Sequence, residues 1–335
     1  MTSKTKIQAI QGWRFIFALF VVAAHLHLTG DYTLSAAAVS FFLVLSGFLA
    51  AHSNTSNIGS FYSKKFWSFY PLHWFALILL APMYFILSKY QTVDFVLRYL
   101  FNSTLLQAFI PPSFSWSVSG GPTLNGPSWF LSILLLFFLL LPIIQKIRQR
   151  SRKLFYGLVI LWCAVGVIFP YLVANSEWYV YFFPPIRMSE CLLGLCLADI
   201  SFSKKPIGTK YEFFVVGLLL LALISSAHIS WVITSTYLWI PVVSLVVWVF
   251  SQSQGVISKV LSSKYMVWLG GISFEIYMFH WVMKRFVISI QEIIKMEFST
   301  SLFVTLVILF TGIVALIYHY WFEPHIINKL RKINN

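Results

Sequence analysis

The chain has 335 residues, of which 59% are hydrophobic and only 10% are charged. A soluble domain carries about 25% charged residues, so this composition excludes a soluble fold and predicts an all-α, polytopic membrane protein. The net charge of +14 would suggest nucleic-acid binding in a soluble protein, but topology explains basic residues in short segments between apolar runs, and we expect membrane lipid and no nucleic acid as partners.

Cys163, Cys191 and Cys196 all lie in apolar runs. They indicate neither a disulfide framework nor a metal site, and we expect no metal and no bound cofactor. Because most of the length is apolar, no room is left for a sizeable soluble domain. Residues 1–335 are therefore interpreted as one integral-membrane domain.

Residues 7–28 form the first run long enough to cross a bilayer, because about 20 apolar residues at 1.5 Å each suffice. Arg14 and His25 lie inside it, and ionisable residues within a membrane helix are costly unless they serve a function. Eleven residues amount to three turns plus about 20°, so both lie on one face, about 16 Å apart. Histidine suits proton transfer and arginine suits phosphate or carboxylate. A snorkelling arginine and a capping histidine are the structural alternative.

The second span, at about residues 34–52, contains the string FFLVLSGF at 41–48. Its Ser46–Gly47 pair is small enough to permit close contact with another helix, which would account for it without any chemistry. Ser46 is kept as a candidate site residue because of the string that surrounds it.

Lys64 and Lys65 precede the third span, which ends near residue 88. They are candidates for binding an anionic donor or, equally, topology charges. Residues 89–127 form an outer loop. Within it, residues 94–110 are moderately apolar but contain charged and amide side chains, which favours an interfacial or re-entrant segment. The Pro-, Gly- and Ser-rich remainder predicts a loop and a place for acceptor contact.

Trp129 opens the fourth span, at about 128–145. A tryptophan at a span entry is most often an interface anchor. Pro142 suggests where this span ends, and a compact basic loop, 146–153, follows it. The fifth span is expected at about 154–173.

The sixth span, at about 186–201, carries Arg187 and Glu190. Three residues apart on one helix face, they predict an intramembrane ion pair that lowers the cost of burying each charge. Structural pairing is the more direct interpretation and substrate contact is the alternative. Two spans without evident chemistry follow, at about 211–228 and 232–251.

Ser273, Tyr277 and His280 form a polar stripe in the ninth span, because they are spaced i, i+4 and i+7 along a helix. Taken alone, such a stripe is more often packing between helices than a site. The tenth span, at about 301–322, is followed by Glu323 and a basic tail.

These strings, in this order, resemble the membrane-bound acyltransferase-3 family, which O-acetylates bacterial cell-surface glycans and related acceptors. The resemblance is carried by Arg14 and His25 with ten residues between them, by the string at 41–48, and by LGGISFEIYMFHW at 269–281. It covers about residues 7–325 and implies ten helices, cytoplasmic acetyl-CoA as donor, and an acceptor outside. It also implies a bacterial cytoplasmic (inner) membrane.

This chain departs from the family in two places. The family usually has arginine three residues before the proline of the third span, where this chain has Ser68 before Pro71, and its basic pair is lysine. Lysine does not bind phosphate in the bidentate manner of arginine. Leucines follow Trp129 where relatives often have acidic residues, so no acidic catalytic role is assigned there.

With 94–110 counted as non-spanning, the chain has about ten transmembrane helices and both termini on the cytoplasmic side. The basic residues then obey the positive-inside rule, and this argument does not depend on the resemblance. The residues on the cytoplasmic side are Lys4, Lys6, Lys64, Lys65, the 146–153 cluster, Lys204, Lys205, Lys210, Lys259, Lys264, Lys329, Arg331 and Lys332.

The resemblance and the topology predict an O-acetyltransferase. It would move an acetyl group from cytoplasmic acetyl-CoA to a hydroxyl of a cell-surface glycan, an O-antigen or exopolysaccharide sugar, free or lipid-linked. Arg14 would hold phosphate or pantetheine oxygens, and His25 would deprotonate the hydroxyl or carry the acetyl group. The residues expected to contact substrate or donor are Ser46, Lys64, Lys65, Trp129, Arg187, Glu190, Ser273, Tyr277 and His280.

Three other functions fit parts of the sequence. A transporter or flippase of lipid-linked glycan also uses buried ionisable residues, although no internal repeat or pair of broken helices is evident. The motif of a lipid acyltransferase is nearly matched by His27 and Asp31, which stand one residue too close. A purely structural scaffold is disfavoured by the ordered series of motifs. The oligomeric state does not follow from the sequence.

Overall fold

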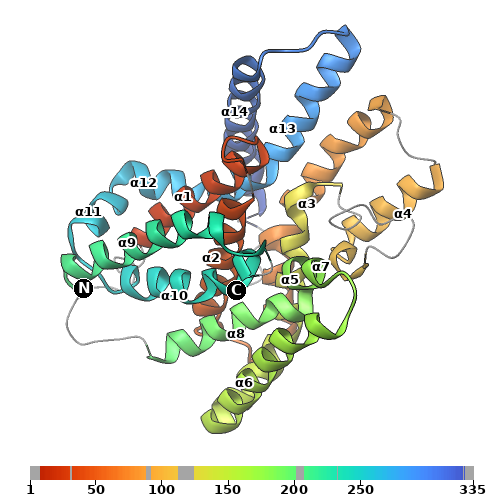
Figure 1. Ribbon diagram of the computed structural model, residues 1–335. Coiled ribbons are helices and arrows are strands. Elements are labelled where there is room, and N and C mark those ends of the chain that lie inside the picture. Colours follow the sequence, from red (N-terminus) through yellow and green to blue (C-terminus); the bar gives the residue numbers. More distant parts are fainter. Residues whose placement is uncertain are drawn as a thin grey trace. The chain divides into compact units, whose positions relative to one another are not determined.

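A computed structural model describes residues 8–30, 32–87, 92–111, 124–200, 207–231, 233–326 and 328. Within these ranges the chain is helical without a β-strand, apart from an isolated bridge between Ile207 and Ser253, which confirms the predicted all-α class (Figure 1). Residues 1–7 and 329–335, on which the prediction of two cytoplasmic termini depends, lie outside the described residues. So does most of the Pro- and Gly-rich loop, residues 112–123.

The helices group into two compact units. Unit 1 comprises Met1–Asn54 and Leu140–Ser273, and unit 2 comprises Thr55–Leu139 and Phe274–Asn335. Helix α5 (Trp129–Arg150) contributes its first half to unit 2 and its second half to unit 1. Each unit has its own packed interior.

Helix α2 (Thr33–Ala50) lies at the centre of unit 1, in contact with α1 (Gln8–His25), α8 (Pro184–Ile200) and α10 (Trp239–Phe250). Its residues are apolar or small on every side, which suits a helix that is surrounded by others. Unit 1 also contains α6 (Arg152–Ile168), α7 (Ser176–Phe182), α9 (Thr209–Ser225), α11 (Val256–Leu261), α12 (Lys264–Gly271), the 3-10 turns Phe169–Leu172 and Ser226–His228, and the π turn Ile233–Tyr237.

Two glycines allow α2 and α8 to cross with their backbones in contact. A Cβ atom added at Gly47 would lie 1.9 Å from the carbonyl oxygen of Cys191, and one added at Gly194 would lie 2.1 Å from that of Val44. Small residues are the expected means of close helix association in a membrane. The close contact predicted for Gly47 is thus confirmed, and its partner is α8.

Unit 2 is built on α3 (Ile58–Leu87), a helix of 30 residues, and the first half of α5. Tyr62 Oη donates to the carbonyl oxygen of Leu139 at 2.7 Å, and Tyr84 Oη to that of Leu124 at 2.5 Å, so the two segments run antiparallel. The other helices of unit 2 are α4 (Thr92–Ser103), α13 (Ser273–Ile294) and α14 (Thr300–Ile317), with 3-10 turns Gln107–Phe109 and Gly126–Ser128 and the π turn Tyr318–Phe322.

Helix α4 runs back along α3. Its C-terminal end contacts the middle of α3, where His73 Nε2 shares a hydrogen bond of 2.7 Å with Asn102 O and Trp74 Nε1 donates to Ser103 O at 2.9 Å. The segment expected to be interfacial or re-entrant therefore contains a helix. Its entry into the membrane stays a prediction.

Among the described residues, seven helical segments are long and apolar enough to cross a membrane, and the bent pair α7–α8 would make an eighth. Helices α1 and α13 are not among them; polar residues interrupt both, including Arg14 in α1 and Lys284 and Arg285 in α13. The chain is thus a multi-pass membrane protein, and the total of ten spans stays a prediction.

The basic segment 146–153, expected to be a loop, is almost wholly helical. Helix α5 continues through Pro142 to Arg150, and α6 begins after a single extended residue, Ser151, whose Oγ accepts from the backbone N–H of Leu154 at 3.2 Å. Serine is a preferred N-cap residue. The expectation was wrong because proline, which suggests a helix end, is tolerated inside membrane helices.

Candidate functional site

Arg14 and His25 both lie on α1, and both side chains are half-buried. Arg14 Nη1 donates to Gln11 Oε1 at 2.8 Å, one turn earlier. His25 is the last residue of the helix, and its ring centroid lies 5.9 Å from that of Tyr32. Because the helix is continuous, the two side chains share a face about 16 Å apart along the axis. They are therefore not in direct contact.

Helix α1 is held by backbone contacts with α11 and α12. A Cβ atom at Gly12 would lie 2.7 Å from the carbonyl oxygen of Leu261, and one at Gly270 would lie 2.2 Å from that of Gln11. Gly270 belongs to the run at 269–281, and its role is steric: it lets α12 touch α1 one turn before the arginine. Ser273 Oγ donates to Gly270 O at 2.8 Å, which ties Ser273, two residues after the end of α12, to the same contact.

The hydroxyl group of Ser46 is hydrogen-bonded within its own helix, because its Oγ donates to Phe42 O at 2.7 Å. This bond fits the packing interpretation of the Ser46–Gly47 pair. A binding role for Ser46 stays a prediction.

Arg187 and Glu190 are fully buried and form the predicted ion pair, with Nη1 and Oε1 3.0 Å apart. Arg187 Nη1 also donates to Ser235 O at 3.3 Å and to the Thr236 hydroxyl. A buried charge is stabilised by a partner of opposite charge together with additional hydrogen bonds. For Arg187 the partner is Glu190, and the π turn before α10 supplies the additional hydrogen bonds. The pair therefore ties α8 to this turn, while substrate contact stays a prediction.

Lys64 and Lys65 lie within the first turns of α3, and both are half-buried. Lys65 Nζ lies 4.0 Å from the centroid of the Phe138 ring on α5, a cation–π contact. This contact gives Lys65 a packing role inside unit 2. Anion binding by the two lysines stays a prediction.

Tyr277 contacts the turn that precedes Trp129. Its Oη donates to the carbonyl oxygen of Pro127 at 2.8 Å, and Trp129 itself is buried. His280 is fully buried, with Nδ1 3.3 Å from Ile276 O in its own helix. The ring centroids of Tyr277 and His280 are 6.2 Å apart, so two residues of the predicted polar stripe lie near the start of α5.

The candidate residues thus fall into two groups, and their roles in substrate or donor binding stay predictions. Those in unit 1 are Arg14, His25, Ser46, Arg187, Glu190 and Ser273. Those in unit 2 are Lys64, Lys65, Trp129, Tyr277 and His280. Arg187 and Glu190 are brought into direct contact, and the polar stripe is divided after Ser273.

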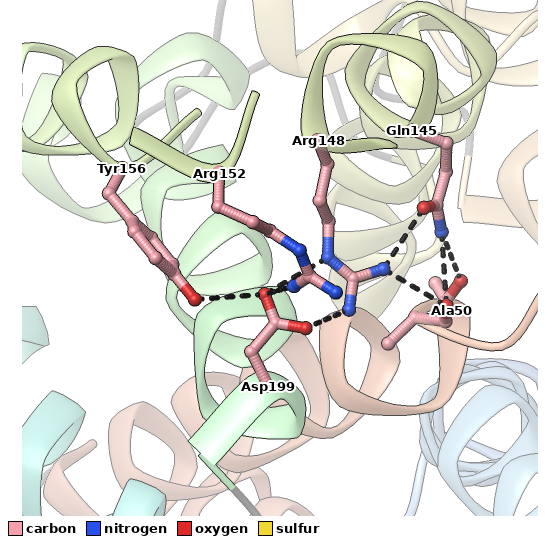
Figure 2. Close-up of polar contacts among 7 residues, drawn as sticks. Ala50, Gln145, Arg148, Arg152, Tyr156 and Asp199 are labelled. Atoms are coloured by element: carbon pink, nitrogen blue, oxygen red, sulfur yellow. Dashed lines mark hydrogen bonds and ion pairs between the residues drawn. The ribbon is translucent and has the colours of Figure 1, made fainter. Parts of the chain in front are cut away.

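Sequence reasoning missed an ionic cluster at the α5–α6 junction, which Figure 2 shows. Arg148 and Arg152 both pair with the carboxylate of Asp199 at the end of α8. Tyr156 Oη donates to Asp199 Oδ2 at 3.2 Å. Arg148 and Arg152 stand i, i+4 across the junction, but their acidic partner is distant in sequence, so only the pair of cations could have been noticed.

The same cluster also caps the C-terminal end of α2. Gln145 Nε2 donates to Ala50 O at 2.9 Å, and Arg148 Nη1 donates to Ala51 O at 3.1 Å (Figure 2). The last carbonyl groups of a helix lack intrahelical partners. Cationic and amide side chains from α5 supply those partners here, so four helix ends of unit 1 meet at one point.

A second missed cluster lies in unit 2. His319 Nδ1 is 3.1 Å from Glu275 Oε1 and 2.5 Å from Glu323 Oε2. The donor atoms of the three residues lie within 4.8 Å of one another, an arrangement open to a protonated imidazole between carboxylates or to a divalent cation. The i, i+4 spacing of His319 and Glu323 is the signal that could have found it. That the chain binds no metal stays a prediction.

The chain matches the family described as "Acyltransferase domain" over residues 7–320 and belongs to this family, as the motifs predicted. Together with the apolar helices, this match defines the class of protein as a multi-pass membrane protein with an acyltransferase domain.

Two curated relatives have names that match this family, and a third has a name that states no activity. Acyltransferase MdmB of Streptomyces mycarofaciens is 26% identical over 241 residues, which cover 58% of this chain and 57% of that protein. ORF330 of Acidianus two-tailed virus, whose provisional name is acetyltransferase, is 24% identical over 276 residues, 78% of each chain. Protein 2 in the picA locus of Rhizobium radiobacter is 30% identical over 140 residues, 36% of this chain and 73% of that protein. No solved structure matches.

Proposed function

We propose that this chain is an O-acetyltransferase of the bacterial inner membrane that moves an acetyl group from cytoplasmic acetyl-CoA to a hydroxyl of a cell-surface glycan. The family match supports acyl transfer, and the name of the viral relative supports acetyl as the group. The observation that carries the proposal is α1, one continuous helix with a cation and an imidazole on one face, about 16 Å apart.

Arg14 would bind an anionic part of the donor. A guanidinium is planar and presents its N–H groups in a fixed fork, and the bond from Nη1 to Gln11 orients that fork relative to the helix. An extended pantetheine arm is of the same order as the distance from Arg14 to His25. A donor whose phosphates are held at Arg14 would therefore present its thioester close to the imidazole.

His25 would act on the acceptor hydroxyl. As a general base it takes the hydroxyl proton while the oxygen attacks the thioester carbonyl carbon. The C–S bond breaks, the C–O ester bond forms, and the imidazolium returns the proton to the departing CoA thiolate. In the alternative route the imidazole attacks the thioester carbon, the C–S bond breaks, and the ring proton passes to the departing CoA thiolate, which leaves acetyl-imidazole. The acceptor hydroxyl then attacks the acetyl carbon, the C–N bond breaks, and the hydroxyl proton returns to the imidazole.

The contacts of α4 support the re-entrant segment expected from the sequence. His73, which meets the end of α4, stands fourteen residues before the last residue of α3. At 1.5 Å per residue this is about 21 Å along the helix axis. A segment that enters from the outer face and reaches this depth would offer a path for a glycan hydroxyl into the bilayer.

The proposal is tested with purified protein in proteoliposomes that receive acetyl-CoA on one side and glycan on the other. His25→Ala should lower acetyl transfer at least a hundredfold, the usual contribution of general acid–base catalysis, with unchanged protein in the membrane. The matched control is His27→Asn, because His27 is exposed and has a φ of 57°, which asparagine tolerates.

Retained transfer by His25→Ala would end the proposal. Glycan movement without acetylation by the wild-type protein would favour the transporter or flippase instead.

A further inference from the structure

A groove of about 580 Å³ lies in unit 1 between the second half of α5, α6 and α8. Side chains from all three helices line it, among them Ile147, Phe155, Trp162 and Met188, and its surface is almost wholly apolar. Apolar cavities do not hold ordered water, because water needs polar partners there. In a membrane protein, hydrocarbon chains are the natural occupant.

The groove is long enough for an extended acyl chain. Along α6 its lining runs from Phe155 to Phe169 in the turn that follows, a separation of fourteen residues or about 21 Å. One leaflet contributes about 15 Å of a hydrocarbon core that is about 30 Å thick. A single phospholipid chain therefore fits along the groove from either end.

One end of the groove lies beside an excess of positive charge. Ile147 and Phe155 line the groove, and the segment between them in sequence contains Arg150, Arg152 and Lys153, all exposed. The carboxylate of Asp199 is shared by two guanidinium groups (Figure 2). One negative charge between two positive ones leaves this junction cationic even where it is paired.

We propose that the groove binds an anionic phospholipid, with an acyl chain along α6 and the phosphate at Arg152 and Lys153. The argument is complementarity: the groove offers an apolar channel that ends at exposed cations, and an anionic phospholipid is an apolar chain that ends at a negative charge. A zwitterionic lipid would fill the channel without matching the charge. The bound lipid would fill the space between α5, α6 and α8, which the ionic cluster joins at this end.

The test is lipid retention by the purified full chain, measured without substrate so that it is independent of acyl transfer. The protein is reconstituted with equal phosphatidylglycerol and phosphatidylcholine, extracted, washed in detergent and analysed by mass spectrometry. The wild-type protein should retain about one phosphatidylglycerol per chain in preference to phosphatidylcholine. Each basic residue near an anionic headgroup contributes about a fivefold change in affinity, so Arg152→Gln with Lys153→Gln should lower phosphatidylglycerol retention at least tenfold.

Two further variants separate the groove from the charge. Gly166 lines the groove, and a Cβ atom there would lie 3.8 Å from Ile186 Cγ2, an ordinary contact. Gly166→Leu should therefore fill the channel without a backbone clash and remove both lipids. Gly157→Leu on the same helix is its control, because a Cβ atom at Gly157 meets no atom within 4 Å.

The control for charge is the double variant Lys259→Gln with Lys264→Gln, at two exposed lysines of unit 1 outside the groove lining. It should retain phosphatidylglycerol as the wild-type protein does. Equal retention of the two lipids by the wild-type protein would overturn the proposal. Unchanged phosphatidylglycerol retention in the double variant Arg152→Gln with Lys153→Gln would also overturn it. Because both of these substitutions are at exposed side chains, the double variant still tests the proposal if Gly166→Leu fails to fold.

Discussion

Helices α1 and α13 both carry candidate site residues, but the two units hold them by different means. In unit 1, α1 is fixed by backbone contacts at Gly12 and Gly270 that leave no space for a methyl group. In unit 2, α13 is tied to the segment before α5 by side chains: Tyr277 Oη donates to Pro127 O, and Asn125 Nδ2 donates to Met278 O at 3.1 Å. The ring of Trp281 also packs against Gly126, where a Cβ atom would lie 2.8 Å from it.

This difference implies different responses to substitution. A close contact between two helix backbones is disrupted by a single added methyl group, because the backbone atoms in contact cannot move unless their whole helices move. A hydrogen bond can be removed alone, at a cost of about 0.5–1.5 kcal/mol. We therefore expect steep losses from changes in the glycine contacts that hold α1 in unit 1, and graded losses from the removal of single hydrogen bonds that hold α13 in unit 2.

The largest effect is expected at the crossing of α2 and α8. Gly194→Ala would bring a Cβ atom 2.1 Å from Val44 O, and overpacking of this kind typically costs about 1–3 kcal/mol or more. Thermal unfolding and size-exclusion chromatography in detergent should show a lower melting temperature and less monodisperse protein. Gly217→Ala, where a Cβ atom meets nothing within 4 Å, is the control and should behave as the wild type.

The next effect concerns catalysis at α1. Gly270→Ala should displace α1 at Gln11 and so disturb the orientation of Arg14. We expect kcat/KM for acetyl transfer to fall about tenfold or more, since an increase of about 1.4 kcal/mol in the activation free energy lowers the rate tenfold. The neighbouring Gly271→Ala has open space around its Cβ atom and should stay within about twofold. Equal activity of the two variants would show that the backbone contact does not position α1.

A smaller effect is expected in unit 2. Tyr277→Phe keeps the ring but removes the hydrogen bond to Pro127 O, which should lower the free energy of unfolding by about 1 kcal/mol. Denaturation of the purified protein would measure it. Tyr265 is 79% exposed, so Tyr265→Phe should change nothing measurable. A Tyr277→Phe loss as large as that of Gly194→Ala would contradict the contrast between the units.

The smallest effect is expected at Lys65. Lys65→Met removes the charge over the Phe138 ring but keeps an apolar stem, and a cation–π contact that is not fully desolvated contributes about 0.5–1 kcal/mol. Lys64→Met should stay within about 0.5 kcal/mol. Measured KM values for acetyl-CoA would separate packing from donor binding: a rise in both variants would assign donor binding to the pair.

The spans could be predicted from the sequence because a membrane helix is defined by its own composition. The second span was expected at 34–52 and is α2, Thr33–Ala50; the sixth was expected at 186–201 and is α8, Pro184–Ile200. The Arg187–Glu190 ion pair could also be predicted from the sequence, because both partners lie on one helix. The π turn within the expected span 232–251 could not be predicted, since hydrophobicity does not distinguish one helical period from another over five residues.

The contacts that position the candidate site could not be predicted in the same way. Gly270 could be read as a small residue in a motif, but its contact with Gln11 joins segments far apart in the chain. Asp199 likewise finds its cationic partners only when α8 and the α5–α6 junction meet. Sequence spacing reports neighbours within an element, whereas the partners between elements depend on the tertiary fold.

The junction at Ser151 leaves no spare chain between α5 and α6. Because a single extended residue joins Arg150 to Arg152, an epitope tag or reporter inserted there would have to unwind one of the two helices. The connection between α13 and α14, Lys295 to Ser299, is several residues longer and largely exposed. It is the position at which a fluorescent or affinity label should leave the protein's architecture undisturbed.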